Sequence, residues 1–304
     1  TDGDAESMSM LAKPFRSYRL QEAMGHLFIH AVLIAISIAC LVPMILIVSI
    51  SLSDEAAITT QGFSLWPVGF TTHAYEYVLR VPQQLYRAYG VTVTITVLGT
   101  TFGLLSAALL GYVLSRTDFS LRGPLSFYVF FTMLFSGGLI PSYIVVTRVL
   151  QLKDSLLALI LPHLIVPYYV LILRTYFAQL PQEILEAARI DGAGEWRIFF
   201  QIVAPLSTPP LATIGLFYLL MYWNDWFLAL LYIDKATLAP LQYLLYKLMT
   251  NIQFLAANPQ TTGVAIPIQP ARMAMAVLAA GPAIFAFLLA QRYFVRGITI
   301  GALK

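Results

Sequence analysis

The stretch Glu186-Ala187-Ala188-Arg189-Ile190-Asp191-Gly192-Ala193, which continues to Ile202-Val203-Ala204-Pro205, is the most informative part of this chain. It is polar and lies between two long uncharged runs. Pro181 stands just before it, where helices often start, and Gly192 can adopt the positive φ that ends many helices. The pattern predicts a short helix, a glycine turn and a second helix.

The second predicted helix carries apolar side chains at the spacing of a single stripe. These are Trp196, Phe199, Phe200 and Val203. In the first helix, Ala187 and Ala188 leave a shallow surface that another protein can approach, and Glu186 and Asp191 offer charges at its edge. We therefore expect this hairpin to dock on a partner. The alternative is a well-capped hairpin that only stabilises its own helix bundle.

The composition indicates a membrane protein. Of 304 residues, 59% are apolar and only 11% are charged, against about 25% charged in soluble domains. The net charge of +3 is small and scattered, which argues against nucleic-acid binding. The single cysteine, Cys40, cannot form an intrachain disulfide, and we expect it to be a buried core residue.

Six uncharged runs are long enough, or nearly so, to cross a bilayer, which takes about 20 helical residues. They hold 31, 28, 25, 19, 27 and 19 residues and lie between Glu22 and Asp54, Arg87 and Arg116, Arg122 and Arg148, Asp154 and Arg174, Arg197 and Asp225, and Arg272 and Arg292. A seventh run, between Lys247 and Arg272, contains many Asn, Gln, Thr and Pro residues, and we expect an external loop there. The sequence predicts six membrane spans in one domain.

The distribution of basic residues gives an orientation. The termini and the segments after spans two and four hold eleven Lys and Arg residues, against seven elsewhere. The excess favours a cytoplasmic location for both termini and for the hairpin. We expect residues 1–26 to form a cytoplasmic segment, with an interfacial helix and disorder both open, and residues 27–304 to form the membrane domain. That domain includes the hairpin loop at about 179–209 and a tail at about 292–304.

Small residues and helix breakers mark specific points in the spans. Gly99, Gly103, Ala107 and Gly111 recur every four residues, so a neighbouring helix should pack closely on that ridge, either from this chain or from a partner. Two regions should interrupt regular helix inside the membrane. These are Gly137-Gly138 with Pro141, and Pro162 with Pro167.

At the hairpin the chain resembles the permease subunits of bacterial ABC importers, whose cytoplasmic loop reads EAA, three residues, Gly, nine residues, Ile-x-Leu-Pro. Only Ala204 departs from that pattern. Asp191-Gly192-Ala193 and the downstream Trp223-Asn224-Asp225 look like the carbohydrate importers of this family. The overall pattern, especially Ser51 to Leu79 with Gly62 to Pro67, looks most like permeases for large, acidic oligosaccharides such as alginate. The resemblance implies an all-α fold, the six-helix type I ABC importer permease fold, with a coupling-helix hairpin between spans four and five.

The resemblance also implies the partners. A second homologous permease would complete the pathway, two ATP-binding subunits would hydrolyse ATP with magnesium, and a soluble binding protein would deliver the carbohydrate at the bacterial inner membrane. This chain has no Gly-x-x-x-x-Gly-Lys-Ser/Thr loop, and no cofactor is expected in it. It also lacks the sequence patterns of catalytic and metal sites, so an enzyme is not expected. The runner-up is a secondary transporter or channel, which would need membrane-embedded carboxylates besides Asp225.

The expected site residues form two groups. The ATPase-coupling group is Glu186, Ala187, Ala188, Asp191, Gly192, Ala193, Trp196, Phe199, Phe200 and Pro205. The translocation-pathway group is Tyr168, Tyr169, Tyr218, Tyr222, Asn224 and Asp225. For the tyrosines, helix packing is the alternative to sugar contact. Asp225 either faces a wet cavity or lies at the membrane interface where span five ends.

Overall fold

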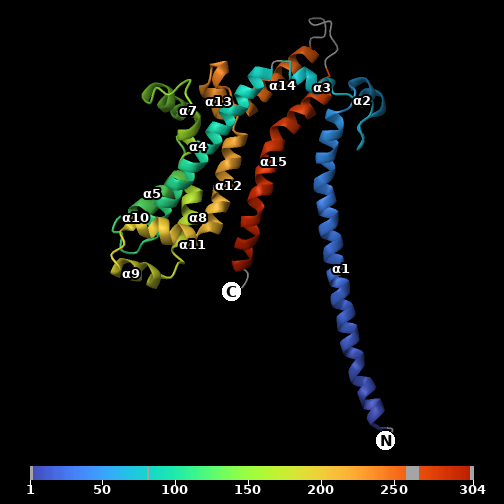
Figure 1. Ribbon diagram of the computed structural model, residues 1–304, viewed down its shortest axis with the longest axis vertical. Helices are drawn as coiled ribbons and strands as arrows, with labels where there is room; N and C mark the ends of the chain where they lie inside the picture. The colour runs from blue at the N-terminus through green and yellow to red at the C-terminus, as the bar shows by residue number, and fades with distance from the viewer. Residues whose placement is uncertain (1–2, 81, 258–266, 302–304) are drawn as a thin grey trace. The chain divides into compact units, whose positions relative to one another are not determined.

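The computed structural model describes residues 3–80, 82–257 and 267–301, and every regular element in those ranges is helical. The chain divides into two compact units. The first comprises residues 1–77 and 267–277, and the second comprises residues 78–266 and 278–304. Figure 1 labels the helices.

The first unit is built around the long helix α1 (Gly3–Ser51), which passes residue 26 without interruption. The short helices α2 (Glu55–Gln61) and α3 (His73–Val78) follow, and α15 (Ile268–Gly301) begins in this unit. Asp54 caps α2 by accepting hydrogen bonds from two backbone N–H groups. The expectation that Cys40 is buried is wrong, because Cys40 is exposed. It lies on α1, whose most apolar stretch contains no buried residue.

The second unit is organised on α4 (Pro82–Ser115), which packs against α8 (Pro167–Phe177) and α12 (Thr208–Asn224). The remaining elements of this unit are α5 (Arg122–Leu134), α6 (Leu139–Ile144), η1 (Val145–Val149), α7 (Leu157–Ile160), η2 (Leu161–His163), α9 (Gln182–Ile190), α10 (Glu195–Ile198), η3 (Phe199–Val203), α11 (Ala204–Leu206), α13 (Phe227–Tyr232), η4 (Ala236–Leu238) and α14 (Leu241–Ala257). In Figure 1, α9 and α10 lie near one end of α4, and α7 and α13 lie toward the other.

The glycine ridge on α4 is a packing surface within this chain, which settles the choice between an intrachain and a partner contact. A Cβ atom on Gly99 would come within 2.5 Å of the Tyr222 ring, and one on Gly103 within 2.8 Å of the Tyr218 ring. A Cβ atom on Gly111 would lie 3.1 Å from the backbone of α8. The ridge therefore lets α8 and α12 approach α4 at backbone distance.

Both predicted helix breaks are present. The first separates α5 from α6 at residues 135–138 and bends the chain by 112°. The second lies between α7–η2 and α8 and bends it by 49°. Three helices are long and apolar enough to span a membrane, and the count among the described residues reaches six if each of three bent pairs forms one span.

The expectation of a loop between Lys247 and Arg272 is wrong for the two ends of this run. Its first part belongs to helix α14, which extends to Ala257, and its last part belongs to α15. Asn251 and Gln253 are exposed while Ile252 between them is buried, so these two polar residues lie on a helix and not in a loop. Residues 258–266 lie outside the described ranges, and for them the loop stays a prediction.

Candidate functional site

The hairpin formed by α9, the turn at Gly192, α10 and η3 has the predicted helix–turn–helix arrangement. Pro181 is the N-cap residue of α9, and Gly192 adopts a φ of +78° beyond its C-terminus. The N–H of Gly192 donates to the carbonyl of Arg189, and the N–H of Ala193 donates to the carbonyl of Ala188, both at 2.9 Å. These two bonds form a Schellman motif, which satisfies carbonyls left open at the end of α9.

The geometry of this turn leaves most of the predicted coupling residues at the surface. Glu186, Ala187, Asp191, Gly192, Trp196, Phe200 and Pro205 are exposed, Ala193 is half-buried and Ala188 is buried. The hairpin thus presents two acidic groups and two large aromatic rings outward.

The expectation of one outward apolar stripe is wrong for half of its members. Trp196 and Phe200 are exposed, with nearly parallel rings whose centroids are 6.1 Å apart. Phe199 and Val203 are buried in the chain's own core, and the Phe199 ring packs 5.4 Å from the ring of Tyr112 on α4. The hairpin folds back on the end of α4, so the inner half of the stripe stabilises this chain and only the outer half is available to a partner.

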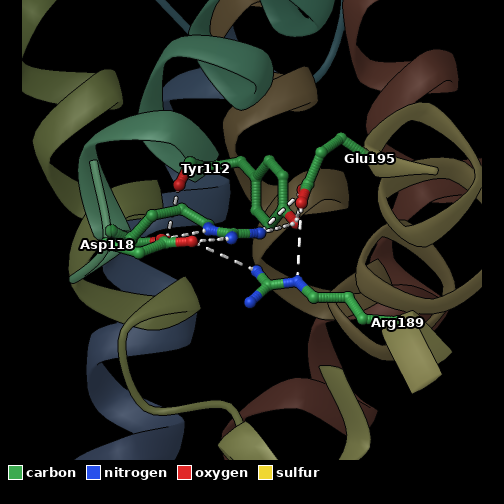
Figure 2. A network of polar contacts seen from close by, with 6 residues as sticks. Tyr112, Asp118, Arg189 and Glu195 are labelled. Atoms are coloured by element: carbon green, nitrogen blue, oxygen red, sulfur yellow. Dashed lines mark hydrogen bonds and ion pairs between the residues drawn. The ribbon is translucent and has the colours of Figure 1, made fainter. Parts of the chain in front are cut away.

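A charge cluster of Arg116, Asp118, Arg189 and Glu195 joins the hairpin to the end of α4 (Figure 2). Arg116 follows the last residue of α4 and Asp118 lies in the next turn, while Arg189 is on α9 and Glu195 begins α10. The guanidinium of Arg116 donates to Glu195 Oε2 at 2.7 Å, to the Tyr112 hydroxyl at 3.0 Å and, through two nitrogens, to Asp118.

The Arg116 side chain is only 11% exposed, whereas the side chains of Asp118 and Glu195 are each 56% exposed. The Tyr112 hydroxyl also lies 3.0 Å from Glu195 Oε2. Arg189 reaches the same two carboxylates at longer distances, 3.6 Å to Asp118 and 3.5 Å to Glu195. Arg116 is therefore the centre of the cluster and Arg189 its outer member.

The cluster keeps its charges because each ion stabilises the other. The hydrogen bonds from Arg116 hold the pKa of Asp118 below its usual range, and the carboxylate of Asp118 in turn raises the pKa of Arg116. Sequence reasoning missed this cluster, since Arg116 and Glu195 are 79 positions apart. The one available signal was their position, each at a helix end next to an apolar segment.

The structure places Tyr218 and Tyr222 in the core, with exposures of 0% and 3%. The Tyr218 hydroxyl donates to the carbonyl of Leu164 and accepts from the N–H of Val166, both at 3.2 Å, and the Tyr222 hydroxyl donates to the carbonyl of Ile160 at 2.9 Å. Leu164 and Val166 lie in the break before α8, and Ile160 is the last residue of α7, so these backbone groups lie at points where regular α-helical bonds are interrupted. Packing, the alternative considered from the sequence, therefore describes these two tyrosines.

The other expected pathway residues are more accessible. Tyr168 is exposed and lines an open groove of about 510 Å³ with Met133, Leu171, Ile172, Thr175, Tyr176 and Gln179. Tyr169 is half-buried and Asn224 is exposed. Helix α12 ends at Asn224, and Asp225 accepts hydrogen bonds from Phe227 and Leu228 at the start of α13 and lies 3.5 Å from His163. Asp225 thus directly follows the end of α12, and its side chain is only 14% exposed.

Known proteins share the sequence pattern and the fold of this chain. The family model described as binding-protein-dependent transport system inner membrane component matches residues 99–300. The polygalacturonan/rhamnogalacturonan transport system permease protein YtcP of Bacillus subtilis is 36% identical over 91% of this chain and 97% of its own length. The arabinooligosaccharides transport system permease protein AraQ of Halalkalibacterium halodurans is 27% identical over 86% of this chain and 90% of its own.

A solved structure agrees with both. It is a bacterial ABC transporter involved in the import of the acidic polysaccharide alginate, and one of its chains matches with a TM-score of 0.76 and 30% identity, covering 88% of this chain and 95% of that chain. Permease subunits of this kind lack an ATPase site of their own. The chain belongs to the family of binding-protein-dependent transport system inner membrane components and is a permease subunit of a sugar ABC transporter.

Proposed function

We propose that this permease forms half of the membrane pathway of an ATP-driven importer, which takes an acidic oligosaccharide from a soluble binding protein and releases it in the cytoplasm by alternating access. The observation that carries the choice of substrate is the agreement between two comparisons. A relative named for polygalacturonan and a solved transporter of alginate both handle uronic-acid polymers. Alginate-like and galacturonate oligosaccharides are the substrates to test first.

The proposed partners are a second homologous permease, two ATP-binding subunits that hold ATP and magnesium, and the binding protein. We place the hairpin against the ATP-binding subunits because its outward face combines Trp196 and Phe200 with the acidic Glu186 and Asp191. An exposed aromatic pair with charges at its edge is suited to a helix-in-groove contact. In this arrangement both termini are cytoplasmic.

We propose that sugar passes the accessible part of the expected pathway group. The groove beside Tyr168 has a volume in the range of small-molecule sites, about 300–1,000 Å³. It combines apolar side chains with the polar groups of Thr175, Tyr176 and Gln179, which can bind hydroxyl groups. Tyr169 and Asn224 are further candidates, whereas Tyr218, Tyr222 and Asp225 would act by holding the helices in place.

Reconstitution tests the whole proposal. The chain is co-purified with the other subunits and placed in proteoliposomes, and ATP hydrolysis is measured with binding protein loaded with oligo-alginate, oligogalacturonate or a neutral oligosaccharide. We expect an acidic sugar to stimulate hydrolysis and to be taken up only with ATP. Uptake driven by an ion gradient, without a nucleotide-hydrolysing partner, would instead establish the secondary-transporter alternative.

The coupling role of the hairpin has a separate test in Gly192→Trp. A side chain at a φ of +78° is strained by about 1 kcal/mol or more, and the indole would project from the turn. We expect an assembled bundle that no longer transports sugar. Gly123→Trp is the matched control, because Gly123 also has open space around it but lies at the start of α5, outside the hairpin. Unchanged transport by Gly192→Trp would contradict the coupling role.

A further inference from the structure

Helix α4 is the central helix of the second unit, but the chain connects the hairpin to α8 on one side and to α12 on the other, and not to α4. The connection to α12 runs through η3 and α11 and turns by 87° before α12 begins. A displacement of the hairpin would therefore reach α12 through a sharp bend. The charge cluster supplies a direct contact with α4, because it fastens the start of α10 to the end of α4.

We infer that Arg116 and Glu195 are positioning residues for coupling, which clamp the hairpin to α4 so that α4 and α12 move together when the hairpin is displaced. This inference rests on the proposed function. The bond from Arg116 to Glu195 is short, 2.7 Å, and it is supported by the Tyr112 hydroxyl, which lies 3.0 Å from both groups. Three groups from α4 and α10 thus converge on one point.

The chemistry of Arg116 suits this task. Its planar guanidinium binds Asp118 through two nitrogens and still directs Nη1 at Glu195. Asp118 is only two residues away, so this local pair fixes the orientation of the guanidinium before the hairpin contributes a bond. A lysine at this position offers one point charge and could not hold both carboxylates in the same geometry.

The ionic contacts of the clamp are shorter and less exposed at its centre, Arg116, than at its edge, Arg189. Arg116 is almost buried, whereas Arg189 is 37% exposed and its contacts with the two carboxylates are about 0.8 Å longer than the closest Arg116 contact with Glu195. Beneath the ions, the rings of Tyr112 and Phe199 pack together. The ionic contact through Glu195 and the apolar contact through Phe199 therefore both join the hairpin to the end of α4, and both must hold if the hairpin is to move α4.

The test is Glu195→Gln in the assembled transporter. This variant removes the charge that crosses from hairpin to α4, and it leaves Arg116 paired with Asp118, so no buried cation is stranded. The measurements are sugar taken up per ATP hydrolysed, basal ATP hydrolysis, and thermal stability of the assembled complex. We expect normal assembly and basal hydrolysis, with sugar per ATP lowered about fivefold or more, the lower end of ordinary coupling strengths.

Arg116→Gln should lower sugar per ATP to the same degree, and the double variant should be no worse than either single one, since both variants remove the Arg116–Glu195 contact. Arg116→Lys should recover part of the coupling. Arg122→Gln is the matched control, because it removes a cation that lies a few residues after Arg116, at the start of α5, and it should keep the wild-type ratio.

Two results would overturn the clamp. One is a wild-type sugar-to-ATP ratio in Glu195→Gln. The other is a loss of uptake that only follows a loss of assembled complex, which would show a purely structural role. Both results can be interpreted only if the wild-type complex couples ATP hydrolysis to sugar uptake. If the wild-type complex shows no sugar-stimulated hydrolysis at all, the proposed function fails instead, so the two failures are separable.

Discussion

The charge cluster and the tyrosine pair, Tyr218 and Tyr222, fasten distant segments in opposite ways. The charge cluster joins two elements by ions, two of which are more than half exposed to solvent. The tyrosine pair joins α12 to the break before α8 by neutral hydroxyl groups that are almost fully buried. Exposed ion pairs contribute about 0–1 kcal/mol each, whereas a buried polar group left without a partner costs about 1–3 kcal/mol.

This difference indicates which contacts hold the bundle and which transmit motion. The tyrosine pair supplies hydrogen bonds that the backbone has lost at the break, so α12 and the broken helix should move as one body. The charge cluster, whose two carboxylates are more than half exposed, contributes little to stability, so breaking it should change how the hairpin moves that body more than whether the bundle folds. Substitutions at the two places should therefore separate stability from coupling.

The largest effect is expected where the tyrosine pair meets the glycine ridge. Gly99→Ala would put a Cβ atom 2.5 Å from the Tyr222 ring, and that ring is buried and held by its bond to Ile160. We expect the free energy of unfolding to fall by about 1–3 kcal/mol, as for other overpacked cores. The measurement is denaturation of the purified chain in detergent, followed by fluorescence.

Gly90→Ala is the matched control on the same helix. Gly90 is exposed and has open space around it, so the same chemical change should stabilise α4, by up to about 1 kcal/mol. The two substitutions should thus have opposite signs. Equal effects at both positions would show that the Tyr222 ring can move aside without loss of stability and that the ridge is not tightly packed.

A smaller effect is expected from removing the hydroxyl groups alone. Tyr218→Phe and Tyr222→Phe keep both rings in place and take away two hydrogen bonds and one, respectively. Hydrogen bonds between membrane helices contribute about 0.6 kcal/mol on average and up to about 1.7. Tyr218→Phe should therefore destabilise the chain more than Tyr222→Phe, in the same denaturation assay.

The exposed Tyr86 on α4 gives the control, and Tyr86→Phe should leave stability unchanged. If Tyr218→Phe and Tyr222→Phe are as stable as Tyr86→Phe, the break before α8 keeps its shape without the two hydroxyl groups. The claim that the tyrosine pair stabilises the bundle more than the charge cluster does would then be wrong.

Sequence reasoning succeeded where a local rule decides the structure. The turn at Gly192, the ridge from Gly99 to Gly111 and the two helix breaks each follow from glycine or proline over a few residues. Such features depend on the backbone and need no knowledge of the neighbour. The family pattern added the expected role of the hairpin, and the comparisons with known proteins confirmed the family.

The failures share one cause, which is that periodicity does not identify the surface that a helix face meets. The apolar stripe of α10 and η3 was visible, but its division between Phe199, which is buried, and Phe200, which is exposed, depends on how the hairpin folds against α4. Asn251 and Gln253 were visible as well, yet they lie on helix α14 and not in a loop. The charge cluster joins residues far apart in the chain, and no local rule pairs them.

The smallest expected effect concerns the stability contribution of the charge cluster and its dependence on pH. Because Arg116 lowers the pKa of Asp118, the unfolded chain takes up protons at Asp118 before the folded chain does. The stabilisation by Asp118 is then complete above the ordinary aspartate pKa, about 3.9, and it is lost only as the pH falls through the lower pKa of the folded state.

We expect the stability difference between wild type and Asp118→Asn to be at most about 1 kcal/mol and constant from pH 8 to pH 5. It should shrink at high salt and on further acidification, as measured by thermal denaturation in detergent at each pH. A difference that grew on acidification, or that ignored salt, would mean that Asp118 acts through packing, and the charge cluster would then resemble the tyrosine pair.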